Sequence, residues 1–419
     1  MTFLYFFESD WKMKARTYGI EIEMASFERV GEFCTQNGGR LYVDCSHIEI
    51  DTPECLTPRQ AALYDKAGER IVRSTASRGL YKNNSSKHRI TKGEASYGRH
   101  DNFLSDEMLY GISDFNTLWL FLATRTMFDG SGSIDNEGKY RTSQRALFVV
   151  SRDGLSMYSG NLHTPIAIFK ESDRLQICTG DSTMSEMQTT FNIAVTSMVL
   201  DFIEDDKTEL TATADEIIRV FHKLPYSFEN FGGFKIQTNQ GRMSAIGVQR
   251  YFLEGAGQNG GDPAFLSQWS SYLDILEAGE YMELKRELDC FTKLWLLERM
   301  RSRHTRDFSD VRMKQADIIF HRLGKNINDM GLYEIARAEG QVDTLFDDEE
   351  IARAVVTPPH TRAAGRALAN TLGLKIGFEP WDYVSHPEDA SLCVNMPNPF
   401  KTYEEEVRKF ARKHGLTRA

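Results

Sequence analysis

The chain lacks paired cysteines, long apolar runs and an excess of positive charge. Its six cysteines are scattered with no CxxC pair, which excludes zinc-ribbon and thioredoxin-type sites and argues against a disulfide framework. The longest apolar stretches, such as LWLFLA at 118–123, are far shorter than a membrane span. The apolar start MTFLYFFESDW lacks the basic residues of a signal peptide. We therefore expect a cytoplasmic protein with no membrane partner.

Basic residues are outnumbered by acidic ones. The chain has 50 Lys and Arg against 60 Asp and Glu, a net charge of -10. Because nucleic-acid binding depends largely on basic side chains that neutralise phosphates, this balance predicts no nucleic-acid partner. Repeats and low-complexity tracts are also missing, and the 41% hydrophobic and 26% charged residues are typical of a globular protein.

Strand-like and helical patterns divide the 419 residues unequally. Alternating residues predict strands at 14–27 and in the first half of 40–52, and the runs ALFVVS and LQICTG predict interior strands. Apolar residues recur at helical spacing in three regions. These are 61–75, the segment that follows a capping-box pattern at Thr183 and Glu186, and much of 263–340. An acidic break and a proline turn then predict a large domain at 1–345 and a small C-terminal domain at 346–419. The predicted class is α+β.

Carboxylates concentrate in the first two strand segments. Several carboxylates aimed at one point repel each other unless a cation or proton lies between them. Hard oxygen ligands select Mg²⁺, which usually bridges to substrate phosphates, and Arg40 on the same strand face would then hold a phosphate. A solvated edge strand is the alternative interpretation. The residues that the two strands would present together are Glu21, Glu23, Tyr42, Asp44 and Glu49.

Further polar candidates lie outside this group. His100 and Asn102 occur in YGRHDNF, and Arg125 and Arg145 could bind anions, although such arginines are more often in surface ion pairs. GSGS at 130–133 lacks the lysine of a P-loop and is interpreted as a turn. His47 and Asp51 have no assigned role, and their spacing is explained by a turn.

A series of motifs resembles the family of the ligase for the prokaryotic ubiquitin-like protein (Pup) and its sister depupylase, which are relatives of glutamine synthetase. The resemblance runs from about residue 18 to 405. It implies a curved antiparallel sheet forming a cradle of glutamine-synthetase type, with helices behind it and a small C-terminal domain. The motifs, in chain order, are GIEIEM, NGGRLYVD, SHIEIDTPEC, DKAGER, SYGRHDNFL, TSQRA, GDSTMSE, SDVRMKQADIIFH and FEPWDYV.

The resemblance also implies roles for single residues. Asp44 matches the catalytic aspartate, Arg40 and Thr52 match nucleotide contacts, Trp381 matches an aromatic near the adenine, and Arg145 is a further candidate for the nucleotide. The implied reaction uses ATP to convert a glutamate-type carboxylate to an acyl phosphate, which an amine then attacks. The matching positions for Mg²⁺ and its surroundings are Glu21, Glu23, Tyr42, Glu49 and His100.

Three departures indicate a divergent member. The depupylase loop between GIEIEM and NGGRLYVD is absent, the segment at 169–173 is short, and Gln176 stands where the family has a histidine. Three functions therefore remain open. The first is a ligase whose carboxylate donor is a small protein or peptide ending in glutamate or glutamine, or a small amino-acid-like carboxylate, with an unknown amine acceptor. The others are an amidase or isopeptidase of the depupylase type, and a nucleotide-binding regulatory protein without turnover.

Overall fold

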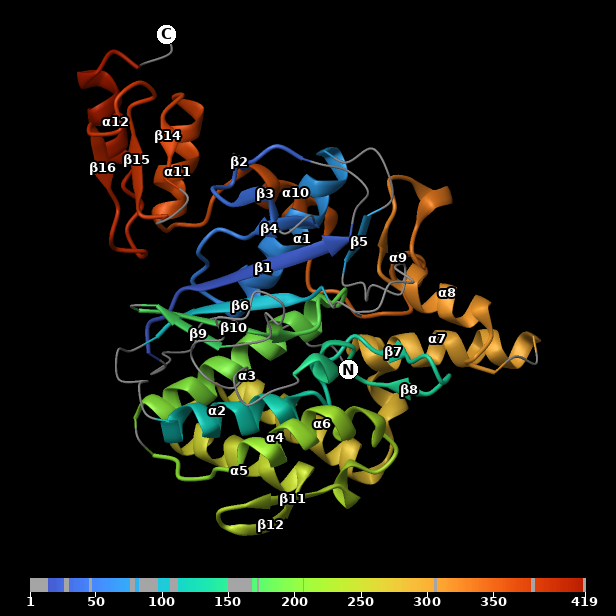
Figure 1. Ribbon diagram of the computed structural model, residues 1–419. Helices are drawn as coiled ribbons and strands as arrows, with labels where there is room; N and C mark the ends of the chain where they lie inside the picture. Colours follow the sequence, from blue (N-terminus) through green and yellow to red (C-terminus); the bar gives the residue numbers. More distant parts are fainter. Residues whose placement is uncertain are drawn as a thin grey trace.

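A computed structural model describes residues 14–25, 30–44, 47–75, 80–82, 97–105, 112–149, 168–171, 173–205, 207–304, 307–377 and 381–416. A central sheet lies between the C-terminal segment and a thick layer of helices (Figure 1). Among the described residues, no helix is both long and apolar enough to cross a lipid bilayer.

All strand pairings of the central sheet are antiparallel, in the order β2-β3-β4-β1-β6-β10-β9, with β5 joining β1 to β13. The predicted strand at LQICTG is confirmed as β10. The strands are β1 (Tyr18–Ala25), β2 (Phe33–Cys34), β3 (Arg40–Asp44), β4 (His47–Asp51), β5 (Leu80–Lys82), β6 (Arg99–Leu104), β9 (Ile168–Glu171), β10 (Arg174–Gly180) and β13 (Arg322–Leu323).

Helices pack against the sheet and against one another, and small two- and three-stranded sheets lie at the periphery (Figure 1). The helices are α1 (Pro58–Thr75), α2 (Ile112–Arg125), α3 (Glu186–Glu204), α4 (Ala214–Lys223), α5 (Ala245–Gln258), α6 (Pro263–Ala278), α7 (Asp289–His304), α8 (Val311–Phe320), α9 (Leu332–Ala338), α10 (Asp348–Val356), α11 (Arg362–Thr371) and α12 (Glu404–Lys413). The small strands are β7 (Ser133–Ile134), β8 (Tyr140–Arg141), β11 (Lys235–Thr238), β12 (Gly241–Ser244), β14 (Lys375–Ile376), β15 (Tyr383–Ser385) and β16 (Cys393–Asn395). The predicted α+β class, with an antiparallel sheet backed by helices, is confirmed.

Two local predictions were wrong. ALFVVS begins as a 3₁₀ helix, η1 (Arg145–Phe148), and not as a strand. The N-cap of α3 is Ser185 and not Thr183, because the Asp289 carboxylate accepts the backbone N–H groups of Met184 and Ser185 at 2.5 and 3.1 Å. Those two peptide groups are thereby held outside the helix.

The alternation of strand residues gives the sheet two different faces. On the apolar side, Ile20, Ile22 and Ile50 are buried in the main hydrophobic core, and α1 packs on β1 and β4. Gly68 allows α1 to approach closely, since a Cβ there would lie 3.2 Å from the Ile50 side chain. We call this side, toward the helices, the back face, and the opposite side the front face.

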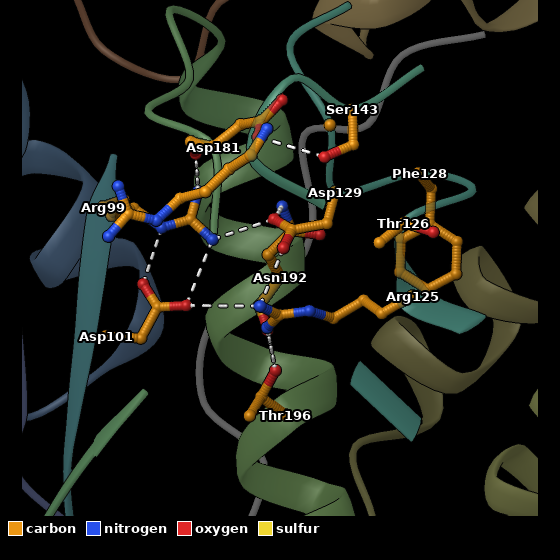
Figure 2. Close-up of polar contacts among 12 residues, drawn as sticks. Arg99, Asp101, Arg125, Thr126, Phe128, Asp129, Ser143, Asp181, Asn192 and Thr196 are labelled. Carbon is orange, nitrogen blue, oxygen red and sulfur yellow. Dashed lines mark hydrogen bonds and ion pairs between the residues drawn. The ribbon is translucent and has the colours of Figure 1, made fainter. Parts of the chain in front are cut away.

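The back face also buries a group of charged residues (Figure 2). Arg99 donates to Asp101 and Asp129, and Asp129 also pairs with Arg125. Arg125 further donates to Thr196 on α3 at 2.6 Å. Arg125 was a candidate anion-binding residue, but this guanidinium is only 1% exposed and stabilises the packing of α2 on α3.

The C-terminal residues form a hydrophobic cluster of their own. Ala369, Val384, Met396 and Val407 are buried together there. Phe346, which the sequence placed in the small domain, instead packs against α1. We therefore propose residues 362–416 as the C-terminal unit, which starts later than the predicted boundary at 345.

Candidate functional site

Strand register gathers the polar residues of the first two strand segments on the front face. Residues directly opposite in antiparallel strands have Cβ atoms about 4.5–5.5 Å apart, so the side chains of such rows face one volume. One row crosses β3, β4 and β1, and the other continues onto β6. The rows are Tyr42, Glu49 and Glu23, and Arg40, Asp51, Glu21 and His100.

Three of these side chains could hold one metal ion. An oxygen of Glu21, an oxygen of Glu49 and a ring nitrogen of His100 lie within 4.8 Å of one another. A second set within the same limit joins Glu49 to Asp44 and His47. Carboxylate oxygens are preferred ligands of Mg²⁺, so the donor chemistry of the first set fits the predicted metal.

The charges of the front face also favour a bound cation. Burial raises the pKa of Glu49, His100 opposes this, and Glu21 and Glu23 raise it further, to about 7. Burial, followed by the charges of Glu21 and Glu49, raises the pKa of Asp51 well above its usual value. The Asp51 Oδ1 atom is buried without a hydrogen-bond partner. A cation among these groups would relieve their repulsion.

Tyr42 and Arg40 lie together on β3. Burial, then Asp51 and then Glu49 raise the pKa of Tyr42, so its phenol keeps its proton among these acids. The Arg40 guanidinium carbon is 3.9 Å from the centre of the Tyr42 ring. Arg40 also donates to a Glu32 oxygen from Nε at 3.0 Å. This arginine is therefore oriented along the edge of the site by two neighbours.

Arg145 is the buried partner of Glu23. Its Nη1 atom donates to a Glu23 oxygen at 3.1 Å, and its Nε donates to the Cys178 carbonyl oxygen at 2.7 Å. Burial raises the pKa of Glu23, but Arg145 and then the two neighbouring histidines lower it well below its usual value. Arg145 has 0% exposure, so the predicted direct nucleotide contact is not supported. The guanidinium instead keeps Glu23 ionised.

Both oxygens of Glu21 accept hydrogen bonds from neighbouring strands. Asn102 and Arg174 donate to Oε1 at 3.1 and 2.6 Å. Gln176, where the resemblance implies a histidine, donates to Oε2 at 2.5 Å, and His100 Nδ1 lies 3.1 Å from the same oxygen. The amide of Gln176 is thus an orienting donor in this structure. The side chains of 169–171 and residue 172, part of the short segment noted in the sequence, lie outside the described residues.

Thr52 and Trp381 both lie near the Arg40 end of the site, but different contacts hold them there. The Thr52 hydroxyl accepts the Ile20 N–H at 2.9 Å, which ties the end of β4 to β1. Trp381 belongs to the C-terminal unit and packs on Arg366, whose Nε donates to the Gly38 carbonyl oxygen at 3.2 Å. Gly38 lies in the turn that leads into Arg40. The contacts of both residues with a nucleotide stay predictions.

Two residues without an assigned role belong to the site. His47 Nε2 lies 3.3 Å from a Glu23 oxygen, and Asp51 stands between Arg40 and Glu21 in its row. The prediction that the spacing of His47 and Asp51 reflects a turn was wrong, because HIEID forms strand β4. Its alternation places His47 and Asp51 on the same face as Glu49, and this period-two signal could have revealed them. Asp44, opposite His47, is exposed at the end of β3.

Comparisons with known proteins show which family this chain resembles. The family model described as Pup-ligase protein matches residues 7–372. The depupylase of Acidothermus cellulolyticus is 32% identical over 385 residues, covering 83% of this chain and 74% of the relative. The Pup--protein ligase of Actinosynnema mirum is 28% identical over 426 residues, covering 92% of this chain and 91% of the relative.

Solved structures show the same fold. The complex of Pup with its ligase PafA has a TM-score of 0.80 at 23% identity, covering 97% of this chain and 93% of that chain. The Pup ligase PafA in complex with ADP has a TM-score of 0.79 at 24% identity, covering 94% and 92%. The fold is therefore shared over nearly the whole length.

Proposed function

The chain belongs to the Pup-ligase family, and from this premise we propose that it is an ATP- and Mg²⁺-dependent carboxylate–amine ligase. ATP converts a glutamate-type side-chain carboxylate to an acyl phosphate, and an amine replaces the phosphate to form an isopeptide bond. The observation that carries this proposal is the front-face cluster in which donor atoms of Glu21, Glu49 and His100 lie within 4.8 Å of one another, beside Asp51, whose pKa is raised as that of Glu49 is. Such a site fits a substrate that arrives with a divalent cation.

The residues that would hold Mg²⁺ are Glu21, Glu49 and His100, with Tyr42 as a neutral neighbour and Glu23 behind them. When bound, Mg²⁺ neutralises charge on the phosphate oxygens during transfer. Among the protein groups, Arg145 and the histidines keep Glu23 ionised, and Gln176 and Asn102 orient Glu21.

The nucleotide is proposed to lie along β3, toward the C-terminal unit. Arg40 would contact a phosphate, for which its planar guanidinium is suited. Thr52 lies at the start of this region, and Trp381 would pack near the base. Support comes from the Arg366 contacts, which bring Trp381 to the turn before Arg40.

Asp44 is proposed to accept the proton of the attacking amine. A lysine amine has an ordinary pKa of about 10.4, so it must lose a proton before attack at neutral pH. The C–N bond then forms, the bond from the acyl carbon to the phosphate oxygen breaks, and inorganic phosphate leaves. The exposure of Asp44 at the end of β3 leaves it accessible to a second substrate.

The proposed donor is a small protein or peptide ending in glutamate or glutamine, because relatives are named for ligation of Pup. A small amino-acid-like carboxylate is the alternative donor, and a cytoplasmic location stays a prediction. A depupylase-type amidase or isopeptidase is the second candidate function, favoured by the 32% identity to a depupylase. A regulatory protein without turnover is the third, favoured by the donors already paired with Glu21.

Nucleotide turnover distinguishes these functions. The wild type and Asp44→Asn are incubated with ATP and Mg²⁺, and peptides ending in glutamate or glutamine are added with an amine acceptor. A ligase gives a conjugate and stoichiometric ADP, both lost in Asp44→Asn. Hydrolysis of a glutamine side chain or an isopeptide without net ATP use indicates the amidase. Bound nucleotide without either product would contradict both enzymatic functions.

A further inference from the structure

One buried arginine joins the distant segments that carry Trp381 and Arg40. Arg366, on α11, is 0% exposed. Its guanidinium carbon lies 4.2 Å from the centre of the Trp381 ring, and its Nη1 donates to the Trp381 carbonyl oxygen at 3.2 Å. A single side chain therefore contacts both the ring and the backbone of Trp381.

The central sheet holds the other side of this guanidinium. Arg366 Nε donates to the Gly38 carbonyl oxygen at 3.2 Å, and Nη1 and Nη2 donate to the two carboxylate oxygens of Glu54, the first at 2.9 Å. Gly38 lies two residues before Arg40, and Glu54 lies two residues after Thr52. The contacts of Arg366 thus reach both sequence segments proposed to meet the nucleotide.

Glu54 is a charged anchor for this arrangement. Arg362 also donates to its Oε1 at 2.6 Å. Burial raises the pKa of Glu54, but Arg366 and then Arg362 lower it, to about 2. Glu54 is therefore ionised at neutral pH and binds two guanidinium groups, and that of Arg366 also lies over the Trp381 ring.

The two parts of the chain meet without space for another side chain. Gly38 has a φ of +82°, and a Cβ there would lie 2.4 Å from the Ala363 carbonyl oxygen on α11. Asn370, also on α11, donates to the Cys34 carbonyl oxygen at 3.0 Å. These contacts fix where α11 sits on the turn between β2 and β3, and so fix the base of the Arg366 side chain.

We propose that Arg366 is a positioning residue for the base end of the nucleotide site. Its flat guanidinium sets the height and tilt of the Trp381 indole relative to the strand that carries Arg40. Arg366 thereby determines how strongly the site prefers a nucleotide over a bare triphosphate. This inference rests on the proposed function, in which Arg40 and Trp381 contact the nucleotide.

Arg366→Lys is the informative substitution. Lysine keeps a positive charge beside Glu54 but cannot stack a planar group on the indole or reach Gly38 and Glu54 together. Affinities for ATP and inorganic tripolyphosphate are measured with Mg²⁺ by calorimetry. We expect about tenfold weaker ATP binding and little change for tripolyphosphate. In turnover, KM for ATP rises while kcat changes little.

Arg362→Met is the matched control, because Arg362 shares the Glu54 carboxylate with Arg366 but does not donate to the Gly38 turn as Arg366 does. Thermal melting of each variant verifies folding. The preference for ATP over tripolyphosphate should be retained in Arg362→Met, and Arg366→Lys should have no further effect on it in a Trp381→Leu background.

Two results would overturn the inference alone: an equal loss of ATP and tripolyphosphate binding in Arg366→Lys, or the same loss of preference for ATP over tripolyphosphate in Arg362→Met. Either would mean that Arg366 only docks the C-terminal unit. A wild type that binds no nucleotide would overturn the proposed function together with this inference.

Discussion

The two faces of the central sheet both carry buried or half-buried acids, but their partners differ, since Asp101 and Asp129 on the back face are each paired with arginine. Asp101 accepts from Arg99 at 2.6 and 3.1 Å, and Asp129 lies 2.8 Å from Arg99 and 2.7 Å from Arg125 (Figure 2). Burial still raises the pKa of Asp129, with Arg125 and Arg99 opposing it. Asn192 also donates to this carboxylate. The back-face acids are therefore satisfied by the protein itself.

The front face has a different balance. Glu23 has its arginine, but Glu49 has a pKa near 7 and Asp51 has a buried oxygen without a hydrogen-bond partner. The difference shows that the number of carboxylates does not identify a cation site. What distinguishes the front face is that the carboxyl groups of Glu49 and Asp51 are not matched by basic side chains. This difference is visible only when the partners of the acids on both faces of β1 and β6 are compared.

The largest effect is expected on the back face. Asp101→Asn leaves Arg99 and Arg125 buried with one fewer negative charge, and we expect a loss of about 3–5 kcal/mol in the free energy of unfolding. Urea denaturation in the presence of a chelator measures it, with Glu49→Gln as the front-face control. A loss below about 1 kcal/mol would show that the back-face charges are not needed for folding and would break the comparison.

Magnesium should stabilise through the front face alone. At a concentration about a hundredfold above its dissociation constant, a ligand that binds only the folded state adds about 2.7 kcal/mol to the free energy of unfolding. We expect this gain in the wild type and its loss in Glu21→Gln and Glu49→Gln, measured by thermal melting with and without Mg²⁺. Equal stabilisation of the wild type and Glu49→Gln would contradict the assignment of the metal residues.

Sequence reasoning found the strand that carries Glu21 and the mixed polar face of β3, because both alternate with apolar residues. It could not distinguish Arg145, which is buried beside Glu23, from an arginine that is exposed and free to bind a phosphate, because the sequence does not show whether an arginine is buried. It also assigned Asp51 to a turn, although HIEID alternates as a strand. Arg366 escaped notice because its role depends on Gly38, Glu54 and Trp381 meeting across more than 300 residues.

Removing the charge of Glu49 should have opposite effects on stability and activity. Without metal, Glu49→Gln is expected to raise the free energy of unfolding by about 1–2 kcal/mol at neutral to mildly alkaline pH, because repulsion from Glu21 and Glu23 is removed. Turnover should fall by about a hundredfold or more. Chelator-treated protein is used for denaturation and Mg²⁺-loaded protein for turnover. If Glu49→Gln were instead less stable than the wild type, the ionised Glu49 carboxylate would have favourable partners in the protein, as the back-face acids have.

Glu54 contrasts with Glu49, because the Glu54 carboxylate is paired with two arginines, Arg362 and Arg366. Its folded pKa is about 2, below the ordinary value of 4.5, so its contribution to stability is present above pH 4.5 and is lost as pH falls toward 2. Between about pH 5 and 3.5 the wild type should lose about 1 kcal/mol through this group. Glu54→Gln should be less stable at neutral pH but show a correspondingly shallower loss over that interval in urea denaturation. Parallel pH profiles for the two proteins would mean that Arg366 and Arg362 do not hold Glu54 ionised, and the contrast with Glu49 would then rest on burial alone.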